Sequence, residues 1–207
     1  MDDQFFNFYE VGIEDKKLHE IEFTAIDFET TGLYPEQDRI IEVGLVKFIL
    51  NGEDLQFGSF VDPERPLPSK ITEICGITQD DLSGAPKIND LMDGILEFLE
   101  GTLMIAHNIN FDYGFLKKEA SVCHKSFNIE YGIDTVAMAK KSFKGLQSYS
   151  LQNLARDLKL SIGEAHRALD DAILCKNLFL LSLNQIENYE NLTVKELFHY
   201  SNTRIKN

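Results

Sequence analysis

The feature that most constrains the fold is a long run of β-branched and apolar residues that ends in a tight-turn signal. Residues 39–50 read RIIEVGLVKFIL, which is long enough for a central strand, and Asn51-Gly52 follows directly. Asn-Gly between two apolar runs favours a two-residue hairpin turn, so residues 55–61 are expected to return antiparallel to the first strand. The sequence therefore predicts a sheet with at least one antiparallel pair.

Strands and helices alternate around this hairpin. We expect an earlier strand at 21–27 and later strands at 102–106 and around 130–134. Helical segments are expected at 86–99, 110–120, 136–142, 151–158 and 167–181, with a short capped helix at Thr78–Asp81. One hairpin followed by alternating strands and helices implies an α/β fold with a mixed sheet and helices on both faces.

The composition restricts the class of protein. The 207 residues fit one main domain, expected at 20–182, with an N-terminal extension at 1–19 and a C-terminal tail at 183–207. No apolar stretch approaches the roughly 18 residues of a membrane span, and the acidic N-terminus argues against a targeting peptide. Three widely spaced cysteines are typical of free thiols, so we expect a cytoplasmic protein with no membrane partner. The formal net charge of −14 excludes a broad basic surface for long nucleic acid, but not a site that holds a few nucleotides.

Two carboxylates separated by one residue lie at the end of the first expected strand. Because side chains alternate along a strand, Asp27 and Glu29 should point to one face, and Ile26 and Phe28 to the other. A divalent cation between the two carboxylates would turn their repulsion into binding energy. An isolated Asp-x-Glu is more often a pair of exposed charges on an edge strand, so this stretch alone leaves both interpretations open.

Two later segments carry further candidates for the same site. Asp112 falls in the first turn of an expected helix, where a carboxylate also interacts favourably with the helix dipole. His166 and Asp171 are five residues apart, which on one helix is about 140° around the axis. They could meet if His166 lies just before the helix and Asp171 on its inner face. Taken singly, Asp112 could be only a helix-start residue and His166 only a surface histidine.

Together these residues match a known family pattern. The order Asp-x-Glu-Thr-Thr-Gly, then Asn-x-x-Phe-Asp, then His-x-Ala-x-x-Asp resembles the DnaQ-like (DEDDh) 3′→5′ exonucleases, which have a ribonuclease-H-like fold with a five-stranded mixed sheet. The resemblance covers about residues 20–182 and extends to the segments Arg39–Gly44, Gly76–Thr78 and Ser150–Leu151. Within this family the chain is most similar to the proofreading subunits or domains of bacterial replicative DNA polymerases.

The resemblance implies a metal-dependent phosphodiester hydrolase. Asp27, Glu29, Asp112 and Asp171 would hold two divalent cations, Mg²⁺ or Mn²⁺, because oxygen-only ligands favour these hard ions. His166 would act as the general base toward the attacking water, and a nucleoside 5′-monophosphate would leave. The family spacing from His166 selects Asp171 rather than Asp170 as the ligand.

The resemblance also indicates where the substrate binds. Thr30, Thr31, Gly32 and Leu33 would line the pocket for the terminal nucleotide, and Phe111 would stack near its base. The expected substrate is a single-stranded 3′ end, of DNA in proofreading or repair, and a DNA polymerase catalytic subunit is a candidate partner. Alternatives are an RNA-processing 3′→5′ exoribonuclease of the same family and a noncatalytic interaction module with the same fold.

Overall fold

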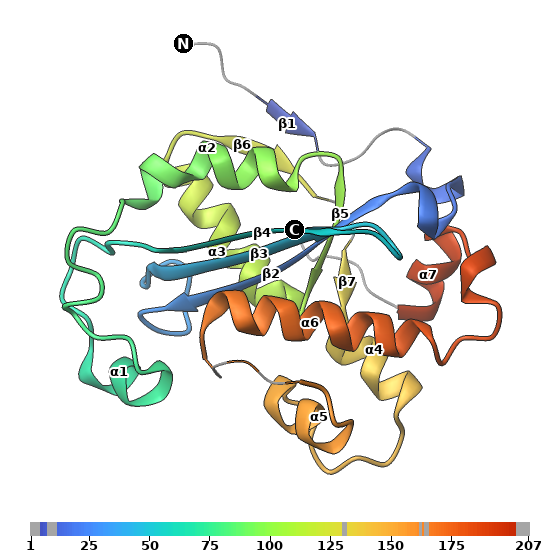
Figure 1. Cartoon of the computed structure of the whole chain (residues 1–207). Coiled ribbons are helices and arrows are strands. Elements are labelled where there is room, and N and C mark those ends of the chain that lie inside the picture. Colours follow the sequence, from blue (N-terminus) through green and yellow to red (C-terminus); the bar gives the residue numbers. More distant parts are fainter. Residues whose placement is uncertain (1–4, 8–11, 130–131, 162, 164–165, 202–207) are drawn as a thin grey trace.

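A mixed five-stranded sheet organises the protein, whose computed structural model describes residues 5–7, 12–129, 132–161, 163 and 166–201. The strands lie in the order β4-β3-β2-β5-β7, with bounds β2 Glu22–Thr30, β3 Ile40–Phe48, β4 Asp54–Phe60, β5 Thr102–Ala106 and β7 Ile133–Asp134. The pairs β2–β3 and β3–β4 are antiparallel, whereas β2–β5 and β5–β7 are parallel (Figure 1). The expected hairpin joins β3 to β4, but the two-residue turn predicted at Asn51-Gly52 is wrong: Phe48 pairs with Asp54, so residues 49–53 form the loop. Asn51 has a φ of 63°, which asparagine tolerates, but Gly52 does not share the positive φ that a two-residue Asn-Gly turn requires. The predicted α/β fold with a mixed sheet is confirmed.

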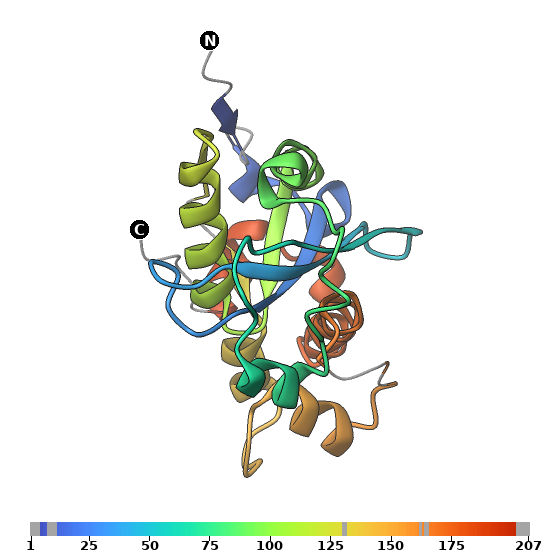
Figure 2. The ribbon, with the colours of Figure 1, turned by 90° about the vertical axis from the view of Figure 1, so that its left-hand side faces the viewer.

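Helices cover both faces of this sheet. The described residues form the α-helices α1 Ser69–Cys75, α2 Ile88–Leu99, α3 Ile109–Val122, α4 Thr135–Ser142, α5 Leu151–Asp157, α6 Ala168–Leu183 and α7 Val194–Ser201. On one face, α2 and α3 pack against Ile26 and Phe28 of β2; on the other, α4 and α6 pack against Phe23 and Ala25. Figure 2 shows α3 and α6 on opposite sides of the sheet. The alternation along β2 therefore sorts its side chains into two separate cores.

Several local elements differ from the prediction. Residues 79–84 form turns rather than a helix, although Thr78 and Asp81 make the expected capping hydrogen bonds. Gly84 with a φ of 81° and Pro86 follow too soon for a helix to continue. The helix α1 was not predicted, nor was a two-stranded parallel pair, β1 Phe5–Asn7 with β6 Ser126–Asn128. Part of the strand expected around 130–134 lies outside the described residues; the rest is β7.

The chain segments before β2 and after α6 pack against the domain. Short 3₁₀ helices lie at Ile13–Asp15, Leu18–Glu20 and Tyr189–Asn191. Ile13 and Leu18 are buried in one core with Val194 and Leu197 of α7. None of the helices in the described part of the chain has the length and hydropathy of a membrane span. The domain boundaries at residues 19 and 182 stay a prediction.

Candidate active site

Asp27 and Glu29 lie on β2 and point toward the face that α6 covers. Phe28 between them is buried in the opposite core, which is the alternation expected from the sequence. The helix comes very close to the strands here because Gly44, the partner of Asp27 on β3, has no side chain. A Cβ atom at this position would lie 2.1 Å from the carbonyl of Ala168. This glycine therefore allows the start of α6 to lie directly beside the two carboxylates.

Asp112 reaches the same place from the first turn of α3. Its side chain is 2% exposed, and its Oδ1 accepts a hydrogen bond of 3.2 Å from the N–H of Phe28. Asn108, just before the helix, has a left-handed φ of 71°, which turns the chain sharply from β5 into α3. The third acid is thus anchored to the strand that carries the first two.

Asp171 lies in the first turn of α6, and His166 lies just before that helix, the arrangement in which the two residues could meet. Oδ1 of Asp171 accepts a 2.6 Å hydrogen bond from Nε2 of Gln152, and Oδ2 accepts a 3.2 Å bond from the N–H of His166. The side chain of His166 is exposed. Possible ligand atoms of Glu29, His166 and Asp171 all lie within 4.8 Å of one another. The structure therefore brings together residues from β2 and α6 that are far apart in sequence.

The electrostatics of this cluster favour a bound cation. Burial raises the pKa of Asp27 well above its usual range, and the carboxylates of Asp112 and Asp171 raise it further. Burial, with the charges of Asp171 and Glu42, raises the pKa of Glu29 to about 8. Burial also raises the pKa values of Asp112 and Asp171. A divalent cation relieves this repulsion, and the all-oxygen donor set suits a hard ion, so the four residues fit a metal site.

A pH-dependent effect of metal on stability follows. Because the pKa of Glu29 is raised from 4.5 to about 8, its contribution favours folding of the metal-free protein at low pH and is lost as the pH rises through about 8. A cation replaces the bound protons, so Mg²⁺ or Mn²⁺ should raise the melting temperature more at pH 8 than at pH 6. At a free metal concentration of 100 times the dissociation constant, the free energy of unfolding rises by about 2.7 kcal/mol. This corresponds to a rise in melting temperature of roughly 5–10 °C.

Differential scanning fluorimetry with EDTA, Mg²⁺ or Mn²⁺ at the two pH values measures this effect. The Glu29→Gln variant is the matched control, since it cannot release that proton and should show a smaller difference between the two pH values. Equal metal-induced shifts of the wild-type protein at pH 6 and pH 8 would contradict the expectation.

An open pocket of about 370 Å³ adjoins the carboxylates. Its walls are the turn after β2, one side of α1 and the start of α3. They include all five residues expected to contact substrate, Thr30, Thr31, Gly32, Leu33 and Phe111. Leu33 is 72% exposed and Ile74 of α1 is 52% exposed, so both present apolar surface to solvent instead of packing in the core. The structure thus places these residues together, while their contact with substrate stays a prediction.

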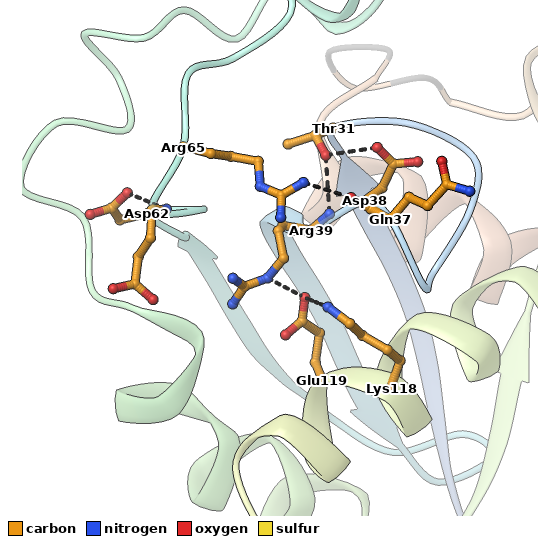
Figure 3. Close-up of polar contacts among 9 residues, drawn as sticks. Thr31, Gln37, Asp38, Arg39, Asp62, Arg65, Lys118 and Glu119 are labelled. Carbon is orange, nitrogen blue, oxygen red and sulfur yellow. Dashed lines mark hydrogen bonds and ion pairs between the residues drawn. The ribbon is translucent and has the colours of Figure 1, made fainter.

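The turn that lines this pocket is held by Asp38 and Arg39. Oγ1 of Thr31 donates to Oδ1 of Asp38 (3.1 Å) and accepts from the N–H of Arg39 (3.0 Å). Nε of Arg39 in turn lies 2.8 Å from Oε1 of Glu119 on α3. Figure 3 shows this pair beside the turn. Glu119 is fully buried and lies about two helical turns after Asp112. The Arg39–Glu119 pair therefore links the pocket turn to the helix that supplies the third acid.

Three polar residues near the site are not among those predicted from the sequence. Glu42 on β3 is buried and contacts Arg167 at the start of α6, and Gln152 of α5 contacts Asp171. A glutamate within the apolar run of β3 was a usable signal, because a charged residue in a central strand requires a partner. Nothing in the local sequence marks Gln152.

The exonuclease family model, RNase_T, matches residues 24–179. The chain belongs to this exonuclease family. Its relatives include the DNA polymerase III subunit epsilon of Treponema pallidum, which is 43% identical over 165 residues, or 78% of this chain and 77% of the relative. The PolC-type DNA polymerase III of Thermotoga maritima is 40% identical over 169 residues, which are 81% of this chain but 12% of that polymerase. The chain thus spans most of one relative and only a small part of the other.

Solved exonuclease structures share the fold. Exonuclease X in complex with 5′ overhanging duplex DNA has a TM-score of 0.64 and 26% identity, covering 83% of this chain and 97% of that chain. The predicted family, fold and enzyme class are confirmed: the protein is a 3′→5′ exonuclease of a family that uses divalent metal ions. The roles of individual site residues stay predictions.

Proposed function

We propose that this exonuclease shortens single-stranded 3′ ends of DNA and releases nucleoside 5′-monophosphates. Two Mg²⁺ or Mn²⁺ ions would be held by Asp27, Glu29, Asp112 and Asp171. The observation that supports this most directly is the convergence of these four carboxylates, with raised pKa values, beside an open pocket. When bound, the ions would activate a water for attack and stabilise charge on the leaving 3′ oxygen.

His166 is the residue that we assign as the acceptor of the proton from the attacking water. Its side chain is exposed at the site, and a ring nitrogen lies within 4.8 Å of ligand atoms of Glu29 and Asp171. Histidine exchanges its proton near neutral pH, which suits a general base. His107 is not available for this role, because both its ring nitrogens are hydrogen-bonded at 2.9 Å, to Thr135 and to the carbonyl of Tyr149.

The pocket beside the carboxylates suits the terminal nucleotide. Leu33, Ile74 and Phe111 offer apolar surface for a base, and Lys70 on α1 offers a positive charge near a phosphate. Because the local site is small, the negative charge of the rest of the chain does not prevent binding of a short strand. The similarity to an epsilon subunit supports a role in DNA proofreading or repair beside a polymerase catalytic subunit in the cytoplasm.

The direct test uses 5′-labelled single-stranded DNA and RNA of equal sequence, incubated with the protein and Mg²⁺ or Mn²⁺. A ladder of shortened DNA products that is absent with EDTA and in the Asp27→Ala variant is the expected result. A ladder from RNA alone would assign the protein to RNA processing. No ladder from either polymer would contradict the proposed function and favour an interaction module.

The His166→Ala variant separates the base from the metal ligands. We expect kcat to fall by roughly 10²–10⁴-fold, which is the usual contribution of a general base. Metal affinity measured by calorimetry should be nearly unchanged, because the four carboxylates remain. A large loss of metal affinity would instead show that His166 is itself a ligand.

A further inference from the structure

A buried carboxylate that the proposed chemistry does not use ties the start of α6 to the sheet. Glu42 on β3 is 5% exposed, and its Oε1 accepts hydrogen bonds from Nε and Nη2 of Arg167 at 3.1 and 2.9 Å. Its Oε2 accepts from the backbone N–H of Ala168 at 3.0 Å. One side chain therefore fixes both the side chain of Arg167 and the first backbone N–H group of the helix.

Two further contacts hold the same segment. The guanidinium carbon of Arg167 lies 5.0 Å from the centre of the Phe60 ring on β4. Gly44, two residues after Glu42 on β3, admits the backbone of Ala168 into the space that a side chain would fill. The residue that follows His166 is thus held by two strands of the sheet.

The neighbouring His166 needs such support. Its φ of 62° lies in the left-handed region, which costs energy for any residue with a Cβ atom and persists only where the surroundings impose it. Arg167 then returns to an extended conformation, with φ −117° and ψ 119°, before the helix begins. Beyond it, Asp171 accepts a hydrogen bond from the N–H of His166. The conformation of His166 is therefore fixed between the Glu42–Arg167 pair and Asp171.

We infer that Glu42 is a positioning residue, which holds His166 where it can take the proton from the attacking water. The inference rests on the proposed function, since it assigns a role only within that reaction. Glu42 thus acts through the position of His166, and not through the overall stability of the fold or through substrate binding.

The Glu42→Gln variant keeps the size of the side chain but weakens its contacts with Arg167 and Ala168. We expect kcat to fall by about tenfold to a hundredfold, since a displacement of a reacting group by about 1 Å can cost up to about a hundredfold, with little change in KM. Arg167→Lys should show a similar loss of kcat, because lysine keeps the positive charge near Glu29 but cannot form the two-pronged contact. A wild-type kcat in Arg167→Lys would overturn the inference.

The matched control is Asp54→Asn. Asp54 on β4 forms an ion pair with Lys176, farther along α6, so this variant also removes a contact between the helix and the sheet. It should keep wild-type kcat, with thermal unfolding measured for every variant. An equal loss of kcat in Asp54→Asn would overturn the inference, because general loosening of α6 would then explain the effect of Glu42→Gln.

The deciding measurement repeats the Glu42→Gln change in a His166→Ala background. If Glu42 acts through His166, adding Glu42→Gln to the His166→Ala variant should lower kcat by less than about twofold. The free-energy losses of the two single variants are then not additive. If the fold losses of kcat in the two single variants multiply in the double variant, the inference is overturned. The proposed function would still stand in that case, provided that the wild-type protein makes the ladder of DNA products. A wild-type protein that makes no ladder would instead contradict the proposed function and this inference with it.

Discussion

Replacing Asp27 with asparagine is expected to lower kcat by at least about a thousandfold and to raise the melting temperature of the metal-free protein at pH 8. The first effect follows because a metal ligand supplies several kcal/mol of transition-state stabilisation, and each 1.36 kcal/mol is tenfold in rate. The second follows because Asp27 is buried beside Asp112 and Asp171, whose charges repel its own. Removing one charge relieves this repulsion, so the variant should lose function and gain stability together.

The labelled-DNA assay with Mg²⁺ and a melting curve in EDTA at pH 8 measure the two effects. Glu22→Gln is the matched control, because Glu22 is an exposed acid at the start of the same strand and should change neither quantity. A metal-free Asp27→Asn protein that melts at a lower temperature than the wild type would contradict this expectation. It would show that the Asp27 carboxylate makes net favourable contacts in the metal-free protein and is not destabilised by its neighbours.

The candidate site could be predicted from sequence because its acids and His166 together match a family pattern, although each residue alone was ambiguous. Burying an acid without a partner destabilises a fold, so acids are uncommon within apolar segments. Asp27 and Glu29 are therefore conspicuous among the apolar residues around them. The two-residue period of a strand predicted Asp27 and Glu29 on one face, and the five-residue spacing allowed His166 and Asp171 to meet if His166 lay before the helix. Both placements are present in the structure.

The contacts that hold these acids could not be predicted in the same way. Glu42 and Arg167 are 125 residues apart, and only the packing of α6 on β3 brings them together. A register shift between Glu29 and Thr30 redirects the chain at the pocket, and no local pattern marks it. The helix α1 is only 7 residues long and is supported by packing of Ile71 and Cys75 in a small core, so tertiary contacts decide its conformation.

A second large effect is expected at Arg39. In the Arg39→Ala variant, the fully buried Glu119 would lose its 2.8 Å partner and, among the residues that the structure describes, keep the weaker 3.4 Å ion pair with Lys118. Leaving a buried charge without its partner typically costs about 3–5 kcal/mol of the free energy of unfolding. For a chain of this size that is roughly 10 °C in melting temperature, which chemical and thermal denaturation will both detect. Lys87→Ala, which breaks an exposed pair with Glu64, should leave the free energy of unfolding nearly unchanged, because solvent screens such a pair.

The cost arises from the unpaired charge, so removing both charges should recover stability. Arg39→Met combined with Glu119→Leu fills the same space with apolar atoms, and such replacements of buried ion pairs are often neutral or stabilising. One oxygen of Glu119, Oε2, has no hydrogen-bond partner among the described residues, which makes recovery more favourable still. The double variant should nevertheless show a raised KM for single-stranded DNA, because the turn that carries Thr31 loses its link to α3. If the double variant is as unstable as Arg39→Ala, the expectation is contradicted. The ion pair would then stabilise the fold by itself, in addition to orienting the pocket turn.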